Sequence, residues 1–136
     1  MITKLDHIAI AVADIDEASR FYTEMLGLEV TGIEELPKEK VKVAFIPIGD
    51  TRLELVQPLT EDSPISKFLE KRGQGLHHLC FQSDDIDKDV QVLVDSEARM
   101  LDKEARAGSH NSRIAFVHPK TNSGVLTELS QPADDH

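Results

Sequence analysis

The chain has 136 residues, of which 40% are hydrophobic and 29% are charged. This composition is typical of one globular domain or two small fused subdomains, and it argues against disorder. The formal net charge of −10 argues against a nucleic-acid partner, because phosphate binding depends on clustered Lys and Arg. The single cysteine, Cys80, cannot form an intrachain disulfide, and no apolar run approaches the ~18 residues of a membrane span. The N-terminus carries no secretory signal, so we expect a cytoplasmic protein.

The N-terminal part of the chain predicts the order β-α-β-β-β over about residues 3–58. His7 lies in the first strand-like run and shares a face with Ala9 and Ala11. Asp14 is expected to cap a helix that ends at Gly27. The strands of this first unit are expected at residues 5–12, 28–33, 41–48 and 52–56, with a charged turn at 34–40.

A linking helix and a second unit of the same order are expected to follow. Ser63 and Pro64 are typical of a helix start, and Gly73 of its end, which places the linking helix at about residues 63–73. The second unit, about residues 75–131, is expected to have strands at 76–82, 98–101, 113–117 and 125–129 and a helix from Asp85. The irregular loop 106–112 is a place to expect substrate contacts. We expect residues 1–136 to form a single domain.

The two units repeat one pattern. Leu5-Asp6-His7-Ile8-Ala9-Ile10 and Asp14-Ile15-Asp16 recur, 71 positions later, as Leu76-His77-His78-Leu79-Cys80-Phe81 and Asp85-Ile86-Asp87. Glu54 follows His7 by 47 residues, and Glu128 follows His78 by 50. The repeat predicts two copies of one unit, each with a His near its start and a Glu near its end.

The recurring side chains suggest a metal site. They are His7, Glu54, His78 and Glu128. A lone strand His is more often structural and a lone strand Glu is usually solvated, but their repetition favours ligands. One divalent ion would satisfy both buried carboxylates, and these N and O donors suit Co²⁺, Zn²⁺, Ni²⁺ or Mn²⁺ without deciding among them. The other histidines, His77, His110 and His118, are expected to be structural, solvated or substrate-facing.

Motifs along nearly the whole chain also carry a family resemblance. They are Leu5-Asp6-His7-Ile8-Ala9, Leu53-Glu54-Leu55, Glu61-Asp62-Ser63-Pro64-Ile65, Gly75-Leu76-His77-His78-Leu79, Phe116-Val117-His118-Pro119-Lys120 and Gly124-Val125-Leu126-Thr127-Glu128-Leu129. Together they resemble the vicinal oxygen chelate superfamily and, within it, the methylmalonyl-CoA epimerases. The resemblance implies an α+β fold in which two tandem β-α-β-β-β units form a curved mixed sheet around one metal ion.

The resemblance also implies a reaction and its residues. His7, Glu54, His78 and Glu128 would bind the ion, and (R)- and (S)-methylmalonyl-CoA would interconvert through an enolate that the ion stabilises. Two proton-transfer groups on opposite faces are then required, and Glu128 is expected to be one of them. In some epimerases a Glu on the third strand is the other. The corresponding residue here is Val43, which cannot titrate, so the second group is unassigned.

An acyl-CoA substrate would bring phosphates to an acidic protein, so we expect local cations near the site. Arg113 and Lys120 are the best placed by sequence, with Ser109 and His110 in the neighbouring loop, although Arg113 or Lys120 taken alone could equally be a solvated surface residue. Superfamily members commonly dimerise, and exposed strand edges offer a route to pairing, so a homodimer is expected.

Two other functions are compatible with the same residues. One is a glyoxalase-type isomerase, like a lactoylglutathione lyase, which would use the same four ligands on a thiol–aldehyde adduct. The other is a metal-dependent binding or resistance protein that sequesters a small molecule. Exchange of the α-proton of methylmalonyl-CoA with solvent distinguishes an epimerase from both.

Overall fold

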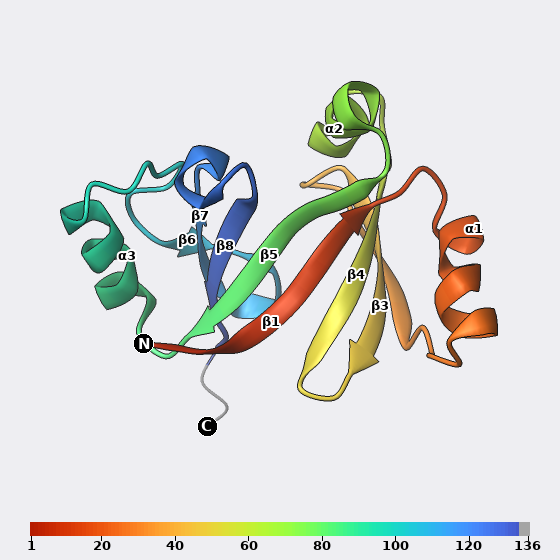
Figure 1. Ribbon diagram of the computed structural model, residues 1–136, viewed down its shortest axis with the longest axis horizontal. Helices are drawn as coiled ribbons and strands as arrows, with labels where there is room; N and C mark the ends of the chain where they lie inside the picture. Colours follow the sequence, from red (N-terminus) through yellow and green to blue (C-terminus); the bar gives the residue numbers. More distant parts are fainter. Residues whose placement is uncertain (134–136) are drawn as a thin grey trace. The chain divides into compact units, whose positions relative to one another are not determined.

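The structure is a computed structural model that describes residues 1–133; residues 134–136, which end the expected domain, lie outside the described residues. Its strands follow an order in which neighbours are hydrogen-bonded. The order is β2 (Gly32–Leu36), β3 (Val41–Ile48), β4 (Thr51–Pro58), β1 (Ile2–Ala11), β5 (Gly75–Ser83), β8 (Leu126–Gln131), β7 (Arg113–Val117) and β6 (Arg106–Ala107) (Figure 1). The pairs β1–β4 and β5–β8 are parallel, whereas β2–β3, β3–β4, β6–β7 and β7–β8 are antiparallel. The sheet is therefore mixed, as the sequence predicts.

The chain divides into two compact units, one formed by residues 7–77 and the other by residues 1–6 together with the chain from His78 onward. We call them the 7–77 unit and the 78–133 unit; the second also contains residues 1–6. Each unit holds part of β1 and part of β5, because both strands cross the division. In the described part of the chain, no helix has the length and apolar composition needed to cross a bilayer.

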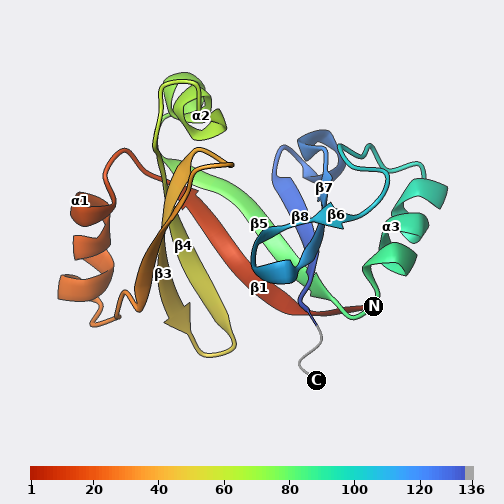
Figure 2. The same cartoon turned by 180° about the vertical axis from the view of Figure 1, so that it is seen from behind.

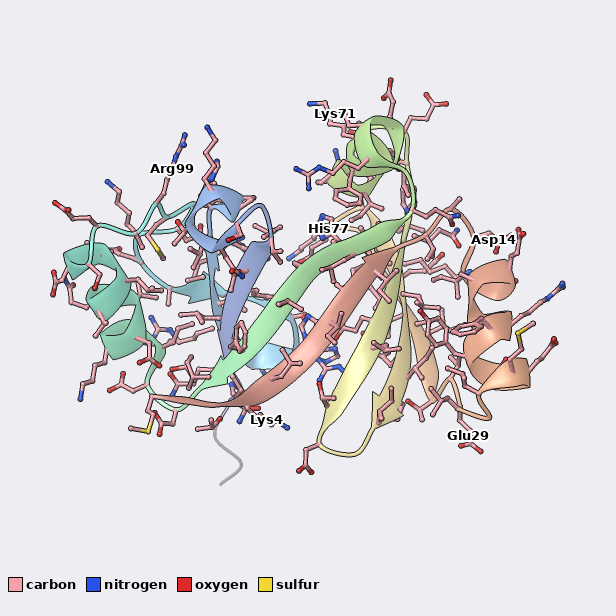
Figure 3. The ribbon with its side chains drawn as sticks, viewed as in Figure 1. Lys4, Asp14, Glu29, Lys71, His77 and Arg99 are labelled. Atoms are coloured by element: carbon pink, nitrogen blue, oxygen red, sulfur yellow. The ribbon has the colours of Figure 1, made fainter. Side chains whose placement is uncertain are left out.

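In the 7–77 unit, α1 (Ile15–Arg20) packs on the β3–β4 hairpin (Figure 1). Ile15 is buried in one apolar cluster with Ile46 and Leu55. Asp14, labelled at the start of the helix in Figure 3, caps it by accepting a hydrogen bond from Asp16 N at 2.9 Å. The helix continues into the π-helical turn Phe21–Met25. A second cluster packs Ile65 of α2 (Pro64–Arg72) against the strands.

In the 78–133 unit, α3 (Ile86–Asp95) packs on β7 and β8 (Figure 2). Ile86 and Val90 lie in one buried cluster with Ala115 and Leu129. A glutamine side chain binds the N-terminus of both α3 and α1. Ile86 N donates to Gln131 Oε1 at 2.8 Å, and Ile15 N donates to Gln57 Oε1 at 2.8 Å. The duplication thus preserves the helix–strand link.

The second strand begins later than expected. Leu28 N donates to Tyr22 O at 2.9 Å and completes the helical turn, and Leu28 and Val30 pack into the α1 cluster. Pairing therefore starts at Gly32, and the expected strand at 28–33 is wrong in its bounds. Glu34 and Glu35 lie in β2 instead of in a turn, since an edge strand tolerates charged side chains.

The expected strand at 98–101 is wrong. Met100 forms only an isolated bridge with Val117, and the N–H groups of Leu101 and Asp102 both donate to Phe116 O. Two donors on one carbonyl interrupt a regular ladder. The strand lies instead in the expected loop, as β6, which pairs with β7.

An ion pair ties the turn before β3 to the loop before α2. The Asp62 carboxylate accepts hydrogen bonds from the Lys40 ammonium and the Thr60 hydroxyl, which lower the pKa of Asp62 from 3.8 to about 2. Because the folded-state pKa lies below the unfolded value, the pair stabilises the folded state fully above about pH 4. The contribution is lost as the pH falls toward 2.

We expect Asp62→Asn to lower the melting temperature slightly at neutral pH, since the pair is exposed to solvent. The difference from the wild type should shrink as the pH is lowered from about 4 to about 2, measured by thermal melts at a series of pH values. Glu61→Gln, an exposed neighbour, is the matched control. An Asp62→Asn difference that stays constant over this interval would contradict the assignment.

Candidate functional site

In the 7–77 unit, His7 and Glu54 come together on the parallel strands β1 and β4. The register places His7 opposite Arg52 and Ala9 opposite Glu54. His7 Nδ1 lies 3.4 Å from Glu54 Oε2, and the two side chains are 9% and 12% exposed. The fully buried Ala9 adds only a methyl group beside them. The structure thus brings together two of the four side chains that the sequence predicts to form a site.

Arg52 completes this half of the site. Its Nε and Nη2 atoms each lie 2.8 Å from Glu54 Oε2, and Nη2 lies 3.4 Å from His7 Nδ1. The guanidinium carbon lies 6.0 Å from the centre of the Phe45 ring, and Phe45 is opposite Glu54 in the β3–β4 register. Arg52 was not predicted from the sequence. Its position two residues before Glu54, hence on the same face of the strand, was the available signal.

In the 78–133 unit, His78 and Glu128 form the corresponding pair on the parallel strands β5 and β8. His78 Nε2 lies 3.2 Å from Glu128 Oε1, and the side chains are 13% and 12% exposed. The His78 ring meets the Phe116 ring edge-on, with 5.9 Å between their centres. Phe116 lies opposite Glu128 in the β7–β8 register.

The aromatic residue beside each Glu was also missed. Phe45 and Phe116 are 71 positions apart, which is the offset that relates His7 to His78. An arginine lies over each ring, Arg52 over Phe45 and Arg106 over Phe116 at 5.7 Å. The same offset could therefore have identified both phenylalanines.

Both pairs supply imidazole and carboxylate groups, which are common ligands of divalent metal ions. Each carboxylate is nearly buried and lies within 3.4 Å of an imidazole nitrogen. A buried carboxylate is costly unless it is hydrogen-bonded or bound to a cation, so both positions favour a positively charged partner. Each pair offers two ligands, fewer than the three or four protein ligands typical of a divalent zinc-type site.

Two of the remaining histidines have structural contacts. His77 packs edge-on against Phe68 of α2 with ring centres 5.0 Å apart, and Figure 3 labels it beside that helix. His118 accepts a hydrogen bond from Lys120 N at 3.0 Å and caps the turn Pro119–Asn122. Burial, then the charges of Arg99 and Lys120, lower the pKa of His118 and favour this neutral, accepting ring.

The candidate substrate residues lie in the 78–133 unit and differ in their contacts. Arg113 forms a two-point ion pair with Asp87 of α3, at 2.6 and 2.8 Å, which raises the pKa of Arg113. Lys120 is exposed. Ser109 and His110 belong to a short 3-10 turn in which His110 has φ 57°, and Ser109 O accepts from Ser112 Oγ at 2.7 Å.

Val43, at the position where some epimerases have a Glu, is 4% exposed and lies in an apolar cluster. Its cluster neighbours include Ala9, Val56 and Ile65. An ionised carboxylate there would be surrounded by hydrocarbon at a high desolvation cost. The environment of this position is thus adapted to an apolar side chain.

Comparison with known proteins shows the family. Residues 6–116 match the family model described as the Glyoxalase/Bleomycin resistance protein/Dioxygenase superfamily. The chain is 43% identical to the mitochondrial methylmalonyl-CoA epimerase of Mus musculus, over 94% of this chain and 72% of the relative. It is 41% identical to the ethylmalonyl-CoA/methylmalonyl-CoA epimerase of Cereibacter sphaeroides, over 96% of this chain and 99% of that relative.

A solved structure shows the same fold. It is a methylmalonyl-CoA epimerase in complex with methylmalonyl-CoA and NH4+, and it is similar to this chain with a TM-score of 0.89 and 40% identity, over 98% of this chain and 96% of that one. The resemblance and the fold class expected from the sequence are confirmed. The chain belongs to the methylmalonyl-CoA epimerase family of the Glyoxalase/Bleomycin resistance protein/Dioxygenase superfamily.

Proposed function

We propose that the chain catalyses the epimerisation of methylmalonyl-CoA by removing the α-proton and returning it on the opposite face. The two nearly buried His–Glu pairs, His7–Glu54 and His78–Glu128, are the observation that carries the proposal. Relatives named as epimerases, one of them solved with methylmalonyl-CoA, support the acyl-CoA substrate.

The four side chains of these pairs are the proposed ligands of one divalent ion. Two imidazoles and two carboxylates suit Co²⁺, Zn²⁺, Ni²⁺ or Mn²⁺ and would neutralise the charge of such an ion. When bound, the ion would supply Lewis-acid stabilisation of the negative charge that develops on the substrate. The protein holds each donor on a strand, which limits its movement.

Glu128 is the proposed proton-transfer group. Its carboxylate lies on β8 beside His78, and the side chain is 12% exposed, so bulk water is largely excluded from it. A carboxylate placed against the α-carbon can remove and return a proton. Val43 cannot contribute a second such group, since its side chain is a hydrocarbon.

A metal-binding experiment tests the proposed ligands. We expect His78→Ala to weaken Co²⁺ binding by at least about tenfold, since a ligand is lost, whereas His77→Ala should leave it nearly unchanged. The Co²⁺ affinity of each variant is measured by calorimetric titration of the metal-free protein. Equal effects of the two substitutions, or a larger effect of His77→Ala, would show that His78 is not the ligand.

Proton exchange tests the reaction. The metal-loaded protein in deuterated water should replace the α-proton of methylmalonyl-CoA with deuterium, detected by mass spectrometry. Glu128→Gln should abolish the exchange, because it removes both a charged ligand and the base. Glu104→Gln, an exposed acid in the same unit, is the control. Full exchange by a metal-loaded Glu128→Gln protein would place proton transfer on another residue.

A glyoxalase-type isomerase remains the second candidate. Val43 leaves this alternative open, because it places no titratable group where some epimerases have a third-strand Glu. Turnover of a glutathione–aldehyde adduct without α-proton exchange on methylmalonyl-CoA would select this alternative. A binding protein of the resistance type would show neither reaction.

Lys120 is the cation proposed to contact the CoA or the substrate carboxylate. Lys120→Ala should raise the KM for methylmalonyl-CoA more than it lowers kcat, because such a contact is similar in the ground and transition states. Arg113→Ala is the comparison: its guanidinium already pairs with Asp87, so its loss should mainly lower the melting temperature. Unchanged KM in Lys120→Ala would contradict the assignment.

Three further expectations stay predictions. They are the single domain, the homodimer and the cytoplasmic location.

A further inference from the structure

Arg52 makes a contact in the 7–77 unit that the proposed reaction does not explain. Both its Nε and its Nη2 bond the same atom, Glu54 Oε2, at 2.8 Å, and Nη2 also approaches His7 Nδ1 at 3.4 Å. The Glu54 side chain is 12% exposed and that of Arg52 is 35% exposed. A permanent cation is thus bonded to a carboxylate proposed to ligate a second cation.

The comparison with the other unit shows that this contact is not required by the fold. Arg106 lies over Phe116 much as Arg52 lies over Phe45. Arg106, however, bonds Asp102 at 3.1 Å, and Asp102 also accepts a hydrogen bond from Phe116 N. The arginine over the ring therefore bonds Asp102, which is not a proposed ligand, in the 78–133 unit. In the 7–77 unit it bonds Glu54, which is a proposed ligand.

We propose that Arg52 is a built-in counter-cation for Glu54, which stabilises the metal-free protein and weakens divalent-ion binding. This inference rests on the proposed metal site. In this proposal Arg52 is a positioning residue, which acts on the ion through Glu54.

The opposing effects follow from charge. In the metal-free protein, Arg52 compensates a nearly buried carboxylate that would otherwise be costly. When Glu54 also ligates a divalent ion, the guanidinium and the ion share one carboxylate and repel each other. The hydrogen bonds to Oε2 also orient the carboxylate, which acts in the opposite direction by favouring the ion. We expect repulsion to exceed orientation, since the ion carries two charges and the shared Glu54 carboxylate is only 12% exposed to screening water.

The test compares charge with hydrogen bonding at position 52. Arg52→Met removes both, Arg52→Gln removes the charge but keeps a donor, and Arg52→Lys keeps the charge. Arg106→Met is the matched control, because it removes an arginine from the equivalent aromatic ring without touching a proposed ligand. Co²⁺ affinity is measured by calorimetry on metal-free protein, and the melting temperature with and without Co²⁺.

Arg52→Met and Arg52→Gln should bind Co²⁺ at least about tenfold more tightly than the wild type, about 1.4 kcal/mol, and melt at a lower temperature without metal. Arg52→Lys and Arg106→Met should keep the wild-type affinity within about threefold. Unchanged or weaker Co²⁺ binding by both neutral variants would overturn the inference about Arg52 but leave the proposed metal site standing. A wild type that binds no Co²⁺ would overturn the metal site and this inference together.

Discussion

Two nearly buried carboxylates in this protein each need a hydrogen-bonding or positively charged partner. Glu54 and Glu128 are each 12% exposed, and each lies within 3.4 Å of an imidazole on the adjacent parallel strand. Parallel pairing of β1 with β4 brings His7 next to Glu54, and parallel pairing of β5 with β8 brings His78 next to Glu128. In each pair the two residues are about 50 positions apart in the sequence. The duplication conserves this arrangement because a buried carboxylate without a partner would destabilise either unit.

The surrounding residues keep the pairs in place. A phenylalanine lies opposite each Glu, Phe45 in one unit and Phe116 in the other. A glutamine three residues after each Glu holds the N-terminus of a helix, as Gln57 holds α1 and Gln131 holds α3. Each unit therefore links its His–Glu pair to its helix through one strand. The units differ in the arginine over the phenylalanine ring, since Arg52 bonds the proposed ligand Glu54 whereas Arg106 bonds Asp102.

The sequence identified the four residues of the two His–Glu pairs, because a fixed offset reveals equivalent positions without any knowledge of contacts. It also predicted the helix starts, since Asp14, Ser63 and Asp85 are caps with a local mechanism. The strand predictions failed at residues 28–33 and 98–101. Leu28 and Val30 pack into an apolar cluster before the strand starts, and Met100 forms a single bridge instead of a strand ladder. The sequence does not show whether the Arg52 side chain contacts Glu54 or points into solvent, because the direction of a long side chain depends on its neighbours in the fold.

We propose that His7, Glu54, His78 and Glu128 bind a single ion. Anomalous diffraction from a crystal of the Co²⁺-loaded protein, collected at the cobalt edge, tests it most directly. We expect one anomalous peak per chain, within bonding distance of all four side chains. A peak bonded to only one His–Glu pair, or separate peaks at the two pairs, would contradict it.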